Sequence, residues 1–213
     1  MIKAIIFDLW GTLFETDAAV RPFDEFAMKI GRTYHDPEFY TAFSETFMTH
    51  PITDLQATMQ QFIARLHMQV DKTTVDALCE IIASNGTVRK YAFPETIAVL
   101  QEFKQKYKIA ILSNTTNISM KQILEKFPIH ELVDEIILSY EVGIQKPDPH
   151  IYALALQRLG VSADEAVMVG DSLRLDVASA ESCGIKGILI DRKNKHPDYP
   201  NRIMTLTDLE RFL

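Results

Sequence analysis

The sequence predicts an α/β fold, a doubly wound parallel sheet that carries an inserted block of helices. Two observations favour this fold. From Pro94 onward, short apolar segments typical of buried strands alternate with longer segments of helical periodicity, and repeated β/α units of this kind form parallel sheets. Before that region, residues from about 20 to 86 show helical periodicity alone. The chain therefore divides into an opening strand, a helical block and a long alternating region.

Length, composition and charge indicate a globular protein without a nucleic-acid or membrane partner. The chain has 213 residues, which suits one large domain or a core with a smaller insert. No apolar run approaches the roughly 20 residues that span a bilayer. The net charge of −7 disfavours a polyanionic partner, and the closest basic cluster, residues 192–195, is expected in a solvated loop. Cys79 and Cys183 have no metal-ligand spacing, which favours a reducing, cytoplasmic location.

The expected strands are short and strongly apolar. The first, residues 2–7, is a continuous apolar run, typical of a strand buried on both faces of a parallel sheet. Gly11, Thr12 and the polar stretch 15–17 are expected to break the chain after it. The other strands are expected at 108–112, 135–139, 166–169 and 187–190, and the helices between them at 95–106, 117–127, 149–159 and 173–182.

The helical block contains one clear amphipathic helix, expected over residues 53–70. Its apolar stripe consists of Leu55, Met59, Phe62, Ile63, Leu66 and Val70. Thr53 and Gln56 are expected to form a capping box at its start. A further helix is expected from Thr73 to the stop signal at Asn85-Gly86. The earlier helices carry an apolar and aromatic set, expected mainly as core packing: Phe23, Phe26, Met28, Phe39, Tyr40, Phe43 and Phe47.

Polar residues follow the expected strands at the sheet edge where ligands bind in such folds. They are Asp8, the pair Ser113-Asn114, Lys146, and Gly170-Asp171 with Asp176 shortly after. Each of them alone has an ordinary explanation as a cap or an exposed side chain. Together they indicate a site for a cation and an anion, because converging carboxylates repel one another unless a cation joins them. Hard oxygen ligands favour Mg²⁺.

The other residues of this set suit a phosphate group. Ser113 and Asn114 can donate hydrogen bonds to phosphate oxygens, as can N–H groups at a helix start. The ammonium of Lys146 would neutralise charge on the nucleophile and on the transferring group. The sequence therefore predicts a site for a small phosphate ester or another small anionic substrate.

Four strings of the sequence resemble the signature motifs of the haloacid dehalogenase-like superfamily. They are Phe7-Asp8-Leu9-Trp10-Gly11-Thr12-Leu13, Ile111-Leu112-Ser113-Asn114, Gly143-Ile144-Gln145-Lys146-Pro147-Asp148, and Val169-Gly170-Asp171-Ser172 with Asp176. They occur in the order that the family shows. The resemblance implies a Rossmann-like core formed by residues 1–14 and 90–213, with a mobile helical cap formed by residues 15–89, as in the helical-cap members of the family.

The resemblance also implies an aspartyl-enzyme mechanism with Asp8 and Lys146 as catalytic residues. Asp8 would attack the substrate, and water would hydrolyse the covalent intermediate. The implied Mg²⁺ ligands are Asp8, Asp171, the backbone carbonyl of Trp10, and Asp176 directly or through water. The implied residues around the transferring group and the substrate are Ser113, Lys146, Asn114 and Trp10.

Trp10 departs from the family's pattern. Family phosphatases carry a second aspartate two residues after the nucleophile, which protonates the leaving alcohol and then activates water. An indole does neither, and such general acid–base help is typically worth about 10²–10⁴-fold in rate. Three functions stay open. They are a phosphatase that obtains its proton elsewhere, a haloacid dehalogenase, whose halide leaves without a proton, and a weakly catalytic or regulatory phosphate-binding protein.

The last motif favours the phosphatase. Dehalogenases of the family typically have Ser-x-Asn where this chain has Gly170-Asp171-Ser172, and they need no metal. Asp171 and Asp176 would then face an anionic substrate with no cation to offset them. Dehalogenases also place an arginine of the cap beside the halide. Arg21 and Arg32 are available, but a surface position is expected for each.

Substrate choice is expected to depend on the cap and on the loop at residues 14–22. His35, His50 and His67 lie in the cap region and are available as substitutes for the missing acid, because imidazole titrates near neutral pH. Ordinary structural or surface positions are nevertheless expected for them and for Arg174. The sequence leaves the oligomeric state open between a monomer and a homodimer.

Overall fold

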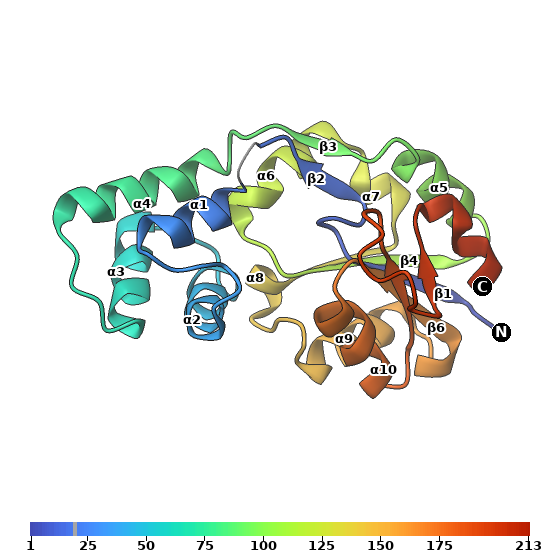
Figure 1. The fold of residues 1–213 in the computed structure, drawn as a ribbon. Helices are drawn as coiled ribbons and strands as arrows, with labels where there is room; N and C mark the ends of the chain where they lie inside the picture. Colours follow the sequence, from blue (N-terminus) through green and yellow to red (C-terminus); the bar gives the residue numbers. More distant parts are fainter. Residues whose placement is uncertain (19–20) are drawn as a thin grey trace.

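The computed structural model describes residues 1–18 and 21–213 and contains a six-stranded parallel sheet (Figure 1). In sheet order the strands are β5 (Glu135–Leu138), β4 (Lys108–Ser113), β1 (Ala4–Phe7), β6 (Ala166–Gly170), β7 (Lys186–Ile190) and β8 (Arg202–Ile203). Every neighbouring pair is parallel. The predicted α/β fold is therefore confirmed with its five expected strands, while the two-residue β8 has no counterpart in the prediction.

Helices cover both faces of the sheet, and this explains why the opening strand is apolar throughout. Ile5 and Phe7 of β1 pack toward one face, and Ala4 and Ile6 pack toward the other, because successive side chains of a strand point to opposite faces. The first face carries α5 (Thr96–Phe103), α6 (Asn117–Lys126), α7 (Ile129–Leu132) and the 3₁₀ helix Leu206–Phe212, and the second carries α9 (Pro149–Leu159) and α10 (Ser179–Ser182).

Several expected elements differ at their ends. The first strand begins at Ala4 rather than at residue 2, and the helix expected over 95–106 covers Thr96–Phe103. Ser139, expected as the last residue of the third strand, begins the short helix α8 (Ser139–Val142). The helix expected over 173–182 begins as a π-helical turn, Leu173–Ala178, before it continues as α10. Such turns are rare and recur at functional sites, and this one carries Asp176.

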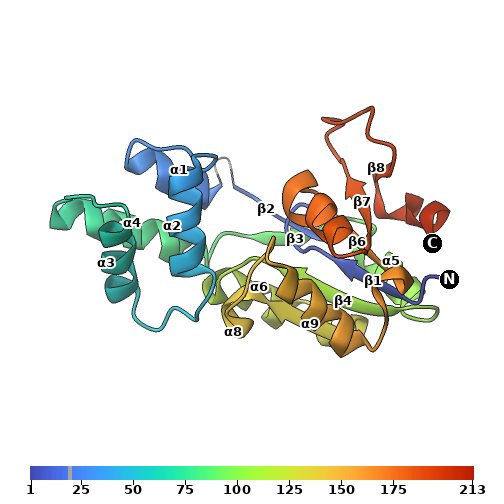
Figure 2. The ribbon, with the colours of Figure 1, turned by 90° about the horizontal axis from the view of Figure 1, so that it is seen from below.

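Four helices pack around a separate hydrophobic cluster and form what we call the helical insert. They are α1 (Pro22–Lys29), α2 (Pro37–Phe47), α3 (Leu55–Arg65) and α4 (Lys72–Ser84). The centre of the cluster is aromatic, and its fully buried rings are Phe26, Phe39, Phe43, Phe47 and Phe62. Core packing is thus confirmed for the first four of these, whereas Met28, expected in the same set, is 67% exposed. Figure 2 shows the insert at one end of the molecule and both termini at the other.

The expectation for the helix at 53–70 is wrong at both ends. Its N-terminal cap is Asp54, whose carboxylate accepts a hydrogen bond from the Ala57 N–H at 3.0 Å, in place of the expected Thr53–Gln56 capping box. The helix ends at Arg65, and His67 has a φ of +51°, which a right-handed helix does not allow. Leu66 still closes the apolar stripe and is buried.

A small antiparallel pair of strands lies where the chain leaves the sheet for the helical insert and where it returns. The strands are β2 (Phe14–Thr16) and β3 (Lys90–Ala92). Residues 15 and 16, expected as part of a break, are therefore strand residues. Among the residues that the structure describes, no helix combines the length and the apolar character needed to cross a bilayer.

Candidate active site

Three carboxylates meet at the carboxyl ends of the central strands. Asp8 directly follows β1, Asp171 directly follows β6, and Asp176 lies on the π-helical turn after it. One oxygen of each lies within 4.8 Å of the others. Parallel pairing of β1 with β6 in register aligns the ends of the two strands, so carboxylates far apart in the sequence come together.

The ammonium of Lys146 lies among these carboxylates and is almost completely buried. Its Nζ lies 2.7 Å from Asp8 Oδ1 and 2.5 Å from Asp176 Oδ1. Asn114 holds the backbone of this lysine, because its Nδ2 donates to the Lys146 carbonyl and its Oδ1 accepts from the Lys146 N–H, both at 2.8 Å. The amide of Asn114, expected beside a phosphate, is thus used to fix the loop that carries Lys146.

The electrostatics of the cluster favour a further cation. Burial raises the pKa of Asp8 to about 6, with Lys146 acting against the shift and Asp176 adding to it. Asp171 keeps contact with solvent, yet loss of water raises its pKa to about 7, and repulsion from Asp8 and Asp176 adds to this. Burial disfavours the Lys146 ammonium, but Asp176 and Asp8 outweigh it and hold its pKa above the ordinary value. One lysine therefore leaves negative charge uncompensated.

Two glycines make room for the acidic side chains. A Cβ atom at Gly170 would lie 2.3 Å from Asp176 Oδ2, and one at Gly11 would lie 2.3 Å from Asp171 Oδ2. Gly11 also has a φ of +74°, a conformation that residues with a side chain rarely adopt. Any other residue at these positions would displace a carboxylate.

Ser113 is the last residue of β4, and its side chain is completely buried. Its hydroxyl has no hydrogen-bond partner among the described residues, 1–18 and 21–213. A buried polar group without a partner costs about 1–3 kcal/mol, so a ligand oxygen that reached this hydroxyl would remove that cost. Ser113 is nevertheless not among the residues that line the pocket beside the carboxylates.

Thr12 and Arg192 contribute to the site although no role was predicted for them. The Thr12 hydroxyl is buried and donates to Asp8 Oδ2 at 3.2 Å. Arg192, expected in a solvated loop, donates from Nη2 to the Thr12 carbonyl and from Nη1 to Glu95 Oε1, both at 2.7 Å. The position of Thr12 inside the first motif is a signal for its role, whereas nothing in the sequence around Arg192 indicates this contact.

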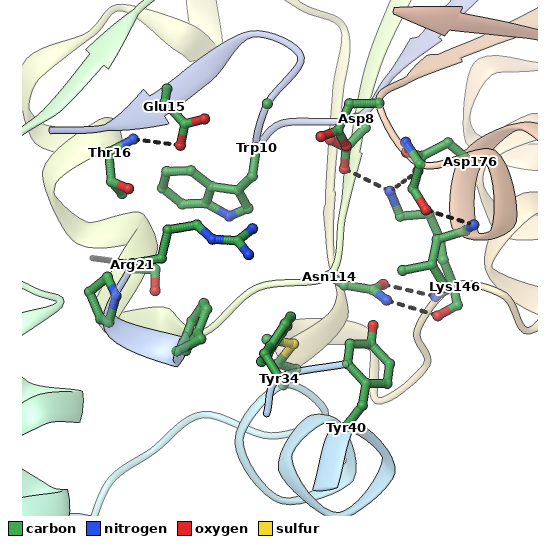
Figure 3. A pocket seen from close by; sticks show the side chains of 18 of the residues that line it. Asp8, Trp10, Glu15, Thr16, Arg21, Tyr34, Tyr40, Asn114, Lys146 and Asp176 are labelled. Atoms are coloured by element: carbon green, nitrogen blue, oxygen red, sulfur yellow. Dashed lines mark hydrogen bonds and ion pairs between the residues drawn. The ribbon is translucent and has the colours of Figure 1, made fainter. Parts of the chain in front are cut away.

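A pocket of about 220 Å³ opens between the carboxylate cluster and the helical insert (Figure 3). From the sheet region, the pocket is lined by the three carboxylates, Lys146, Asn114 and Trp10. From the insert and the adjoining segments, it is lined by Glu15, Arg21, Phe23, Tyr34, Tyr40 and Asn85. Trp10 is fixed by its indole N–H, which donates to the Thr115 hydroxyl at 3.1 Å. The pocket is small, so it suits a small molecule.

Some candidates of the insert lie at the pocket and others do not. Arg21, expected at the surface, lines the pocket, and its Nε donates to Asp24 Oδ2 at 2.7 Å. Arg32 pairs with Asp36 and Glu38 instead, and Arg174 lies over the ring of Tyr40 at 5.5 Å. The three histidines, His35, His50 and His67, are exposed, and none lines the pocket. Of the loop at 14–22, residues 19 and 20 lie outside the described residues.

Direct contacts hold the insert against the sheet region beside the pocket. Gln145 Nε2 donates to the Ser44 hydroxyl at 3.0 Å, one residue before Lys146. Asn117 bonds both backbone groups of Ile52, at 3.0 and 3.2 Å, and Asn85 Nδ2 donates to the Ser119 hydroxyl at 2.7 Å. The described structure therefore has the insert docked over the carboxylates.

Comparison with known proteins agrees with the four motifs. A family model of haloacid dehalogenase-like hydrolases matches residues 2–184. The chain is 29% identical over 203 residues to the glyceraldehyde 3-phosphate phosphatase of Methanothermobacter thermautotrophicus, covering 90% of this chain and 86% of that protein. It is 27% identical over 207 residues to the (S)-2-haloacid dehalogenase 4A of Burkholderia cepacia, covering 93% and 87%.

A HAD family enzyme of Bacteroides thetaiotaomicron, solved with magnesium and inorganic phosphate, shares the fold. It aligns with a TM-score of 0.62 and 20% identity, over 93% of this chain and 100% of that chain. The family match spans most of the chain and includes all four motifs, and the resemblance inferred from the sequence is confirmed. The chain belongs to the haloacid dehalogenase-like hydrolases.

Proposed function

We propose that this hydrolase is a Mg²⁺-dependent phosphatase, which acts on a small phosphorylated metabolite through an aspartyl-phosphate intermediate on Asp8. The observation that carries the proposal is the convergence of Asp8, Asp171 and Asp176 within 4.8 Å, with a single lysine bonded to Asp8 and Asp176. Three carboxylates beside an anionic substrate repel it unless a divalent cation joins them. The phosphatase of M. thermautotrophicus supports the same reaction class.

The donor set fits Mg²⁺. Carboxylates of Asp8, Asp171 and Asp176 are hard oxygen ligands. Burial and mutual repulsion raise the pKa values of Asp8 and Asp171, so a cation would stabilise their charged forms. Gly11 and Gly170 lack the Cβ atom that would clash with the Asp171 and Asp176 carboxylates. We propose these three residues and the backbone carbonyl of Trp10 as the ligands, Asp176 directly or through water. A bound Mg²⁺ would polarise the phosphoryl oxygens and offset their charge.

The residues of the chain would divide the reaction between them. Asp8 attacks phosphorus, while the Thr12 hydroxyl on its Oδ2 and the Lys146 ammonium on its Oδ1 hold the carboxylate in one orientation. Lys146 stays charged, and it therefore also offsets the charge of the transferring group. The buried Ser113 hydroxyl is proposed to donate to a phosphoryl oxygen. Asn114 acts through Lys146, whose backbone it holds.

A 2-haloacid dehalogenase is the second candidate, and Trp10 is the observation that favours it. A departing halide needs no proton, so an indole in place of the usual acid costs such an enzyme nothing. Arg21 lines the pocket from the insert side, and the B. cepacia dehalogenase is similar over most of its length. Asp171 and Asp176 weigh against this candidate, because a metal-independent dehalogenase would hold them beside an anionic substrate with no cation to offset their charge.

Assays of phosphate release and of halide release distinguish the phosphatase from the dehalogenase. Aryl and acyl phosphates should release phosphate with added Mg²⁺ and fail to do so with EDTA, and Asp8→Asn should abolish the release. Halide release from 2-chloropropionate that EDTA does not affect would replace the phosphatase with the dehalogenase. If the protein released neither phosphate nor halide but bound beryllofluoride tightly, it would be a regulatory phosphate-binding protein.

We propose further that residues 15–89 act as a cap on a core formed by residues 1–14 and 90–213. The separate hydrophobic cluster of α1–α4 and the passage of the chain through β2 and β3 support this division.

We propose that the protein works in a reducing compartment such as the cytoplasm. The two free thiols, Cys79 and Cys183, support this proposal.

A further inference from the structure

We propose that Glu15 is the general acid and general base of this site and takes the role that Trp10 cannot fill. The inference rests on the proposed phosphatase function. It concerns one step of that reaction, the proton transfer to the leaving oxygen and the later activation of water.

The position of Glu15 follows from the short strand β2. Phe14 is fully buried beneath this strand, and the side chain of the next residue points to the opposite face. Glu15 is half-buried there and lines the pocket. Its Oε1 accepts a hydrogen bond from the Thr16 N–H at 2.9 Å, which leaves Oε2 for a second contact.

The geometry of phosphoryl transfer places the leaving oxygen on the side of Glu15. Attacking and leaving oxygens lie roughly in line through phosphorus, so the leaving group points away from Asp8. Figure 3 shows Asp8, Lys146 and Asp176 on one side of the pocket, with Glu15 and Trp10 on the other. An acid on the wall across from Asp8 is therefore on the leaving-group side.

Other groups of that wall are poor proton donors. The guanidinium of Arg21 does not give up its proton in proteins, and the indole of Trp10 has no acidic proton. Burial raises the pKa of Tyr34 above its ordinary value, with Tyr40 adding to the shift, so its phenol holds its proton firmly. Of the carboxylates among the described lining residues, Glu15 is the one that lies outside the cluster of Asp8, Asp171 and Asp176.

The charge of Glu15 is within electrostatic reach of the reacting centre. Burial is the main cause of the raised pKa of Asp171, and Glu15 is among the negative charges that add to it.

Every bond and proton is accounted for in the two steps of the reaction. In the first, an Asp8 oxygen forms a bond to phosphorus, the bond from phosphorus to the ester oxygen breaks, and that oxygen takes the proton of Glu15 to leave as an alcohol. In the second, Glu15 carboxylate takes a proton from water as the water oxygen attacks phosphorus. The aspartyl-phosphate bond breaks, and Asp8 and inorganic phosphate are released with Glu15 again protonated.

The test compares leaving groups in Glu15→Gln. An alkyl phosphate needs a proton on its leaving oxygen, whereas 4-nitrophenolate leaves without one. We expect the kcat for alkyl phosphates to fall by about 10²–10⁴-fold, the usual worth of a general acid. The initial burst of 4-nitrophenolate, which reports the first step, should stay close to wild type and shows that the variant is folded. Asp17→Asn is the matched control, since Asp17 is exposed and does not line the pocket.

The results separate this inference from the proposed function. An equal loss in the rate of the first step for both esters, or none for either, overturns the role of Glu15 as the acid and leaves the phosphatase in place, provided that wild type shows Mg²⁺-dependent turnover abolished by Asp8→Asn. A wild type without such turnover overturns the proposed function itself. A selective loss for alkyl phosphates supports Glu15 and is not expected of a residue that only maintains the shape of the pocket.

Discussion

The ammonium of Lys146 lies 2.5 Å from Asp176 Oδ1, and both side chains are only 2% exposed. The same ammonium also bonds Asp8 at 2.7 Å, so one buried lysine joins the predicted nucleophile to a predicted metal ligand. This lysine offsets part of the negative charge that the carboxylates bring to the site.

The first prediction concerns the loss of the lysine. Lys146→Met would leave Asp8 and Asp176 buried without their partner, and breaking a buried ion pair typically lowers the free energy of unfolding by about 3–5 kcal/mol. Urea unfolding followed by circular dichroism at pH 7.5 in EDTA measures this. Lys121→Met at an exposed position of α6 is the control and should change the stability little. An unchanged urea midpoint in Lys146→Met would contradict the buried pair.

The second prediction concerns pH without metal. The pKa values of Asp8 and Asp171 are raised to about 6 and about 7 in the folded chain, above the value of about 3.9 for an unfolded aspartate. Between about pH 4 and about pH 7 the folded state therefore binds more protons than the unfolded state. By linkage, the free energy of unfolding falls as the pH rises from about 4 to about 7. Unfolding in EDTA at pH 5 and pH 8 should show the fall.

Two comparisons check the assignment to these carboxylates. Asp171→Asn should make the loss of stability between pH 5 and pH 8 smaller. Mg²⁺ should stabilise the wild type more at pH 8 than at pH 5, because protons compete with the metal for the same oxygens. Equal stabilisation by Mg²⁺ at both pH values would argue against metal binding at this cluster.

The third prediction concerns Gly170. A Cβ atom there would lie 2.3 Å from Asp176 Oδ2, so Gly170→Ala must displace this carboxylate. We expect a loss in Mg²⁺ affinity of about 10–100-fold, as for other changes that disturb the orientation of a ligand. Titration calorimetry measures the affinity. Gly160→Ala is the control. The new Cβ would have no atom within 4 Å, but the backbone at this position has a φ of +66°, which strains an alanine. The free energy of unfolding should therefore fall while the Mg²⁺ affinity stays the same.

The fourth prediction uses the fluorescence of Trp10, the one tryptophan of the sequence. Its indole lines the pocket and donates to Thr115, so its emission reports on the site. Beryllofluoride with Mg²⁺ should change the emission, and Asp8→Asn should remove the part that depends on beryllofluoride. A flat titration in the wild type would contradict binding of a phosphate analogue beside Trp10.

Local patterns in the sequence predicted the strands and the set of residues at their ends. The apolar run before Asp8 is continuous because β1 is covered on both faces, and it is visible without any knowledge of distant residues. The same holds for the alternation from β4 to β7, which implied a parallel sheet and hence a common edge for Asp8 and Asp171. Both carboxylates lie at that edge in the structure.

Local patterns failed where neighbouring signals competed. Thr53 and Gln56 matched a capping box, yet Asp54 caps α3, because any of several adjacent polar residues can satisfy the first N–H groups and packing selects one of them. The apolar spacing continued to Val70, but the backbone turns at His67, since side chains after a turn can still reach the same hydrophobic cluster.

Sequence by itself determined the five central strands, most of the helices, their order and most of the chemical groups at the site, because these depend on neighbours along the chain. Tertiary structure alone decided which groups touch: Lys146 between Asp8 and Asp176, Arg192 on the carbonyl of Thr12, and Glu15 facing the pocket. Those contacts depend on the paths of loops and on the way the helical insert packs over the sheet. Such paths minimise the free energy of the whole chain, and no short segment encodes them.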